Sequence, residues 1–152
     1  MAISMFNEYN YLNSIKSKIP EIKTISRVTG LAGMEEAMAH LRSLTPLMLF
    51  VEDDGDGYLD LSEGNLDHGF HTFSIVDMVK LDDSDDRQRA LAACMAAGLK
   101  VFKQMIEDSR NFKDPVYGFD RSHITYQMVG PLLNNSYGYM FTYTLKNERF
   151  NF

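Results

Sequence analysis

The sequence has a single cysteine, Cys94, among its 152 residues. One cysteine cannot form a disulfide within the chain, so a reducing compartment suits the protein. Long apolar runs are also missing, because nowhere do eighteen apolar residues follow one another, and we expect no membrane-spanning helix and no membrane partner. The first eighteen residues have neither an early positive cluster nor an uninterrupted apolar segment. We therefore expect no signal peptide and synthesis in the cytoplasm.

An excess of basic residues is absent as well. The 15 lysines and arginines are outnumbered by 21 aspartates and glutamates, which gives a net charge of -6. This balance argues against binding through nucleic-acid phosphates, so no sequence-specific nucleic-acid binding is expected. With 45% hydrophobic and 24% charged residues, the chain is predicted to form one compact domain with one core.

Motifs of enzyme active sites are missing too. The chain contains no glycine-rich phosphate loop, no Gly-x-Ser-x-Gly motif and no cysteine with a nearby histidine. Acidic residues gather at 52–63 and 82–86, but both stretches are polar and would not raise a carboxyl pKa for acid catalysis. His68 and His71 would point to opposite faces of a strand and could share a metal only in a turn. We therefore predict no catalytic residue and no enzymatic activity.

Apolar periodicity and turn residues predict an α+β fold with a mainly antiparallel sheet. The expected elements are helices at about 4–19, 34–44 and 84–109, a hairpin at 47–62, and strands at 70–79, 122–129 and 137–145. Within the single domain 1–152, we expect an N-terminal helix and connector (1–30), an α+β core (31–149) and a tail (146–152). Residues 21–28 suit either a strand or an extended connector.

Two of these elements carry further expectations. The carboxylates of residues 82–86 suit the start of a helix, where free amide groups and the helix dipole favour negative charge. Residues Tyr137, Tyr139, Phe141 and Tyr143 share one face of the last strand, and no cations lie beside them, so they are predicted to form core or subunit contacts. In the tail, Phe150 and Phe152 suit contact with a neighbouring subunit.

The stretch LMLFVEDDGDGYLDL, residues 47–61, has two competing interpretations. In the first, residues 47–51 form a strand buried on both faces and residues 58–62 return beside it. The intervening Gly-Asp-Gly supplies the backbone freedom of a tight turn, and aspartate bonds its own backbone there. The acidic residues would then form a solvated hairpin tip.

In the second interpretation, residues 52–63 resemble the calcium-binding loop of EF-hand proteins, with oxygen ligands at alternate positions. The candidate ligands are Glu52, Asp54, Asp56, Tyr58 through its carbonyl, Asp60 and Glu63. Glu52 differs from the usual first residue, and Pro46, Gly64 and Gly69 disfavour helices on either side of the loop. We therefore favour the hairpin without a metal or other cofactor, and keep a calcium-binding module as the alternative.

Three stretches carry a broader resemblance: TPLMLFVEDD, where a strand leads into an acidic reversal; FHTFSIVDMV, followed by the acidic helix start; and YGYMFTYTLKN near the C-terminus. Their order resembles that of bacteriophage tail-terminator proteins over about residues 33–149, and related head-to-tail adaptors look alike at this level. The resemblance rests on the order of elements and on no diagnostic motif. The helix at 4–19 and its connector are additional to the family.

The resemblance implies a subunit of a hexameric ring that caps the tail tube, stops its polymerisation and joins it to the neck. The expected partners are further copies of the chain, tail-tube proteins and neck proteins. The expected location is the tail or neck of the virion, with the host cytoplasm during assembly. The family recognises its partners by surfaces, so no functional residue is carried over.

Overall fold

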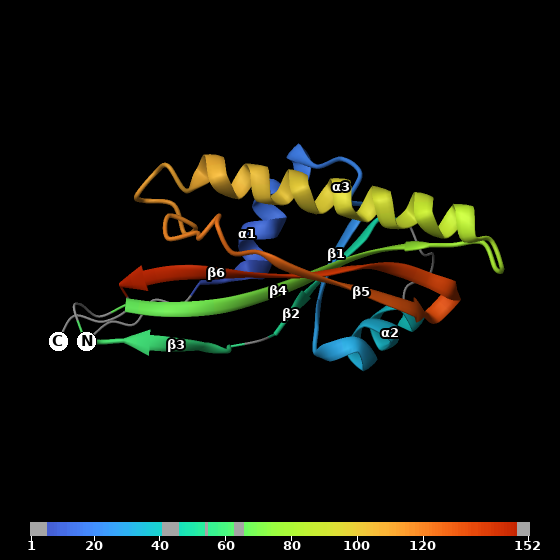
Figure 1. Ribbon diagram of the computed structural model, residues 1–152, viewed down its shortest axis with the longest axis horizontal. Coiled ribbons are helices and arrows are strands. Elements are labelled where there is room, and N and C mark those ends of the chain that lie inside the picture. The colour runs from blue at the N-terminus through green and yellow to red at the C-terminus, as the bar shows by residue number, and fades with distance from the viewer. Residues whose placement is uncertain (1–5, 41–45, 54, 63–65, 149–152) are drawn as a thin grey trace.

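A computed structural model describes residues 6–40, 46–53, 55–62 and 66–148 (Figure 1). The helices are α1 (Glu8–Ile15), α2 (Gly30–His40) and α3 (Ser84–Asp108), with short 3-10 turns η1 (Lys16–Lys18) and η2 (Leu133–Asn135). The strands are β1 (Thr24–Val28), β2 (Met48–Glu52), β3 (Gly57–Asp60), β4 (Leu66–Met78), β5 (Thr125–Leu132) and β6 (Ser136–Glu148). None of the described helices is long and apolar enough to cross a membrane.

The strands form one sheet in the order β1-β2-β4-β6-β5, and β3 pairs with β4 outside this path. The pairing of β1 with β2 is parallel, and the other pairings are antiparallel. The long strands β4 and β6 pair along their whole length, from Leu66 opposite Glu148 to Met78 opposite Ser136. The predicted α+β fold with a mainly antiparallel sheet is confirmed.

Helices cover both faces of this sheet (Figure 1). On one face, α3 lies along β4 and β6, with α1 beside it, and their apolar side chains enclose the main core. Gly98 of α3 sits directly on the ring of Phe141, since a Cβ at Gly98 would lie 2.4 Å from that ring's Cζ. On the other face, Met34 and Met38 of α2 pack near Phe50 in a smaller cluster.

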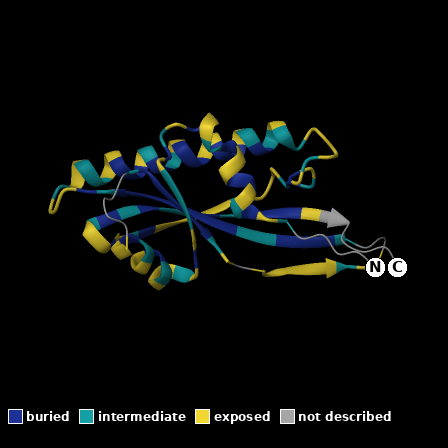
Figure 2. Ribbon diagram, turned by 180° about the vertical axis from the view of Figure 1, so that it is seen from behind, coloured by how far each residue is buried: buried dark blue, intermediate teal, exposed yellow. Residues whose placement is uncertain are grey.

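Strand β2 is buried on both faces, as its uninterrupted apolar sequence predicts. Leu49 and Val51 enter the core below α3, whereas Met48 and Phe50 enter the cluster below α2. Figure 2 shows the contrast with β3, whose residues are mostly exposed. The sheet is therefore well covered in its middle and open toward β3.

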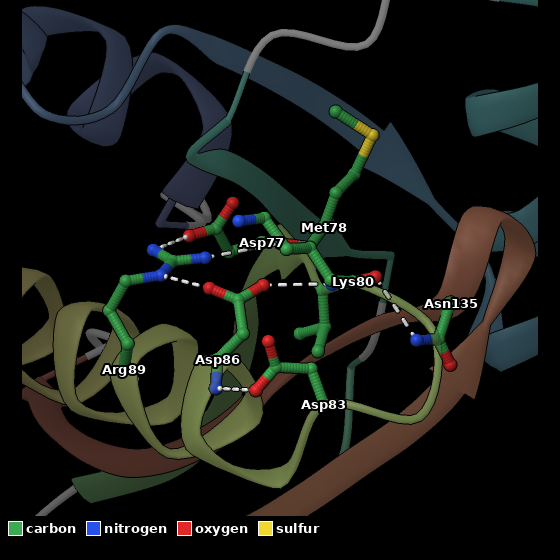
Figure 3. Close-up of polar contacts among 8 residues, drawn as sticks. Asp77, Met78, Lys80, Asp83, Asp86, Arg89 and Asn135 are labelled. Atoms are coloured by element: carbon green, nitrogen blue, oxygen red, sulfur yellow. Dashed lines mark hydrogen bonds and ion pairs between the residues drawn. The ribbon is translucent and has the colours of Figure 1, made fainter.

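The start of α3 is held by the acidic run that the sequence places there (Figure 3). The side chain of Asp83 caps the helix by accepting a hydrogen bond from the Asp86 amide at 2.9 Å. Asp86 accepts hydrogen bonds from Arg89 Nε at 2.7 Å and from the Lys80 amide at 2.8 Å. Arg89 also donates to the buried Asp77 carboxylate at 2.9 Å. The predicted capping role of these carboxylates is confirmed.

These contacts make the stability of the fold depend on pH through Asp86. The hydrogen bonds from Arg89 and from the Lys80 amide lower the pKa of Asp86. A lowered pKa in the folded state means that ionised Asp86 stabilises the fold above the unfolded pKa of about 3.9, and that this contribution is lost as pH falls through the folded value. We expect Asp86→Asn to be less stable than the wild type at pH 7, with a smaller difference at pH 3.

Urea unfolding at the two pH values measures this difference. Asp85→Asn removes a charge from the same first turn of α3 and serves as the control for the helix dipole. A difference between wild type and Asp86→Asn that stays constant from pH 7 to pH 3 would contradict the assignment.

The predicted hairpin at 47–62 is wrong. Strands β2 and β3 do not pair with each other, and both run antiparallel to β4 along the same edge, with Val51 opposite Phe73 and Gly57 opposite Gly69. The chain advances six positions from Val51 to Gly57, whereas β4 advances only four from Gly69 to Phe73. Asp53, Gly55 and Asp56 therefore belong to a short insertion between two segments that pair with the same strand. The chain instead reverses its direction between Asp60, the end of β3, and Leu66, the start of β4.

Long-range pairing explains this correction. After β2, the Asp53 amide donates to the Val28 carbonyl at 2.9 Å, which holds the chain beside β1. The Asp56 carbonyl then accepts from the Phe70 amide at 2.8 Å, and contact with β4 resumes. Gly57 allows this approach, because a Cβ there would lie 2.4 Å from the His68 carbonyl oxygen.

Several boundaries also differ from the predictions. Helix α1 begins at Glu8 behind an Asn7 cap and ends at Ile15, so it is shorter than the predicted 4–19. Helix α2 begins at Gly30 instead of residue 34, β4 begins at Leu66 instead of 70, and β5 continues to Leu132. Residues 21–28 contain the strand β1. Residues 1–5, 41–45 and 149–152, including Phe150 and Phe152, lie outside the described part of the chain.

Candidate functional site

The proposed calcium ligands do not lie in a helix-loop-helix. Glu52 ends β2, Asp56 lies in the short insertion, and Tyr58 and Asp60 belong to β3. Asp54 and Glu63 lie outside the described residues. Because residues 57–60 are extended and paired with β4, successive side chains point to opposite faces of the sheet and do not converge on one ion. The EF-hand geometry is therefore wrong for the described part of this stretch.

Asp60 has a local role in the turn that follows β3. Its carboxylate accepts hydrogen bonds from the hydroxyl and the amide of Ser62, at 2.6 and 3.1 Å. These hydrogen bonds lower the pKa of Asp60. Across the described residues, no group of three or more histidine, cysteine, aspartate or glutamate side chains is placed to hold a metal ion.

The same stretch instead forms one wall of a cleft of about 520 Å³. The start of α1 and the part of β4 around Gly69 and His71 also line it. Arg27, at the end of β1, closes one side. Segments that are far apart in the sequence therefore meet at a single concave surface.

Buried ionisable side chains lie at the base of this cleft. Glu8, in the first turn of α1, is buried, and His71, on β4, is partly buried, with Glu8 Oε2 and His71 Nδ1 3.8 Å apart. Asp67 lies four residues before His71 on β4 and therefore on the same face of the strand. It is also buried. The ring of Phe6 packs edge-on against the His71 imidazole at 5.0 Å between centroids. A carboxylate and an imidazole thus share a poorly solvated surface.

Arg27 connects the rim of the cleft to α1. Its guanidinium lies over the ring of Tyr9, 4.9 Å from the centroid, and donates to Asn7 Oδ1 at 3.4 Å. Its Nε lies 3.8 Å from a carboxylate oxygen of Asp53. The rim therefore already holds one guanidinium between an aromatic ring and a carboxylate.

His68 and His71 point to opposite faces of β4, as their spacing predicts for a strand. His68 stacks on Tyr58 with 4.3 Å between ring centroids and an interplanar angle of 6°. His71 lies on the other face, near Phe6 and Tyr143. The two imidazoles are therefore not arranged to chelate one metal.

Cys94 is buried in α3, where burial raises the pKa of its thiol to about 12. The thiol consequently stays protonated at neutral pH, and a protonated thiol is a poor nucleophile. Cys94 therefore serves as a small packing residue between α3 and the sheet. Of the aromatic residues on β6, Phe141 and Tyr143 belong to the main core, as predicted.

A second surface of interest is the open edge of the sheet at β5. Residues 122–145 include no aspartate, glutamate, lysine or arginine. At this edge, Tyr126 and Met128 are 63% and 51% exposed. They lie opposite Phe141 and Tyr139, on the face that carries α3. Tyr126 and Met128 remain exposed because α3 packs on β4 and β6, which lie beside β5 in the sheet or beyond it.

The described residues thus present two features suited to recognition: an acidic cleft below α1 and an uncharged apolar edge at β5. Sequence reasoning missed the cleft, since its residues come from separate elements. The lack of charge in residues 122–145 was the available signal for the edge. Comparisons with protein-family models, with curated proteins and with solved structures find no match to this chain.

Proposed function

We propose that this chain is a non-enzymatic structural subunit of a phage or phage-like tail, a tail-terminator or tail-completion protein that assembles into a ring. Its partners would be further copies of itself, the tail tube and the neck, and its location the virion tail or neck after assembly in the host cytoplasm. Two of the three stretches that carry the resemblance to tail terminators, FHTFSIVDMV with the helix after it and YGYMFTYTLKN, form the predicted elements and support this proposal.

The observation that carries the proposal is the exposed edge of β5. Soluble proteins usually protect such edges with charged side chains, prolines or covering loops, because unpaired backbone groups pair with other strands. Here residues 125–128 are exposed and uncharged, and Tyr126 packs on Tyr139 with the rings nearly perpendicular and 5.5 Å apart. Pro131 lies only toward the far end of the strand. The edge is therefore suited to contact with another protein chain.

The position of this edge suits a ring. β5 and β1 are the two ends of the strand order. A contact between β5 of one copy and a different surface of the next copy joins two unlike surfaces and is therefore heterologous. Heterologous contacts close into rings when the rotation between copies allows it. The net charge of -6 fits a channel subunit that does not grip DNA.

Met128→Glu tests the role of the edge. Placing a carboxylate in an apolar contact, repeated at every interface of a ring, is expected to weaken self-association or tube binding at least about tenfold. Size-exclusion chromatography with light scattering, with and without tail-tube protein, measures the change. The wild type should form a ring-sized oligomer alone or on the tube.

Leu31→Glu is the matched control, because Leu31 lies on α2 and is 49% exposed, close to the value for Met128. It should leave assembly unchanged. A wild type that stays monomeric and does not bind tube protein would overturn the proposal, as would equal effects of the two substitutions.

A further inference from the structure

We propose that the cleft below α1 binds an organic cation, an ammonium or guanidinium group carried on an aliphatic chain. This inference concerns a surface distinct from the β5 edge and does not rest on the proposed role in a tail. Its basis is the size, charge, burial and wall chemistry of the cleft.

The volume of the cleft suits either a small molecule or a side chain of a partner protein. Ligand pockets in proteins span roughly 300 to 1,000 Å³, and this cleft measures about 520 Å³. A diamine, an arginine side chain or a lysine side chain fits within that volume. The cleft is open to solvent on one side, so a group attached to a larger molecule could enter.

The charges that line the cleft favour a cation. Among the described residues that line the cleft, five carry carboxylates, and two, Arg27 and His71, carry or can carry a positive charge. The carboxylates are Glu8, Glu52, Asp53, Asp56 and Asp67. Glu8 and Asp67 are buried and already interact within the protein, and because water screens buried charge poorly, their field still extends into the cleft.

The arrangement suits an organic cation better than a metal ion. A calcium ion needs six to eight oxygen ligands at 2.3–2.6 Å, which requires carboxylates gathered around one point. The described carboxylates of the cleft do not gather in this way. They come from α1, from the end of β2 and the insertion after it, and from β4, and so can contact a cation whose donors are spread over a larger group.

The walls provide the apolar part of such a site. Phe6, Tyr9 and Leu59 line the cleft beside the carboxylates. Arg27 already places its guanidinium over the Tyr9 ring, 4.9 Å from the centroid, which shows that this wall accepts a planar cation. An aliphatic stem could lie against Phe6 and Leu59 while its charged end approaches Asp67 or Glu8.

Calorimetric titration with agmatine, putrescine and a blocked arginine amide tests the proposal, with N-butylurea as the uncharged analogue of agmatine. We expect the cations to bind and N-butylurea to bind at least about tenfold more weakly, because it lacks the charge. If the arginine amide matches agmatine, the natural cation can be a side chain of a partner; if only the free amines bind, it is a small polyamine. Either result supports the shared chemistry.

Variants locate the binding. Asp67→Asn should weaken agmatine binding about tenfold, and Asp56→Asn, at the exposed rim, about threefold. Phe6→Leu should weaken it about threefold through loss of the aromatic wall on which the stem is proposed to lie. Asp85→Asn on α3 removes the same charge far from the cleft and should change nothing. If Asp67→Asn fails to fold, Asp56→Asn and Phe6→Leu still decide the outcome.

Three results would overturn the proposal. The first is the absence of binding by every cation at about 10 mM, where even a weak site would be detected. The second is equal binding of agmatine and N-butylurea. The third is an equal loss of affinity in Asp56→Asn and Asp85→Asn, which would indicate a response to net charge instead of a site.

Discussion

Phe73→Ala is expected to lower the free energy of unfolding by about 3–5 kcal/mol, the usual range for truncating a buried phenylalanine. Phe73 lies in the middle of β4 and is 0% exposed. Its ring contacts those of Phe102, Phe141 and Tyr143, with centroids 5.4, 5.3 and 6.0 Å away. The substitution therefore leaves a cavity where α3 meets β4 and β6, and it removes several aromatic contacts at once.

Chemical denaturation monitored by circular dichroism measures this loss. Phe112→Ala is the matched control, because Phe112 is 72% exposed and should change stability by less than about 0.5 kcal/mol. Phe73→Leu should recover part of the loss, since it refills some of the cavity. A loss below about 1 kcal/mol for Phe73→Ala would contradict the central place of this ring in the core.

The elements that the sequence predicts best are those whose own pattern determines them. Helix α3 spans Ser84–Asp108, close to the predicted 84–109, because a strong capping sequence precedes a long amphipathic stripe. Strand β6 likewise follows its aromatic alternation from Ser136, one residue before the predicted start. In both cases local preference and burial agree, so tertiary contacts have little to override.

The hairpin was mispredicted because its local signal is ambiguous. Asp-Gly-Asp-Gly suits a tight reversal, but the partner of β2 and of β3 is β4, a strand that the chain reaches only later. Pairing with β4 lets the chain continue in the same direction after residues 53–56. Turn chemistry could not reveal this choice, since it depends on which strand is available at the sheet edge.

The cleft could not be predicted for a related reason. Glu8, Arg27 and His71 carry no motif, and they are 19 and 44 positions apart along the chain. They meet only because β1 joins the sheet in parallel and brings α1 over the end of β4. Tyr126 is exposed because α3 packs on β4 and β6 and does not extend over its side chain. The alternation of residues within β5 does not reveal how far α3 extends over the sheet.

Gly138→Ala is expected to lower the free energy of unfolding by about 3 kcal/mol, at the upper end for overpacking, because backbone and not side chain must move. A Cβ at Gly138 would lie 1.8 Å from the Ile75 carbonyl oxygen and 2.8 Å from the Val76 Cα. Both atoms belong to β4, so the central β4-β6 pairing must shift. Gly33→Ala, in α2, is the control with the opposite sign.

At Gly33 the nearest atom to an added Cβ is the Val28 Cβ at 3.6 Å, an ordinary contact. Alanine also favours a helix over glycine by about 1 kcal/mol, so Gly33→Ala should stabilise the protein by about 0.5–1 kcal/mol. Thermal and urea unfolding of both variants would measure the pair of effects. If Gly138→Ala is as stable as the wild type, the close approach of β6 to β4 at this position is contradicted. No other requirement for glycine at position 138 predicts a loss of stability.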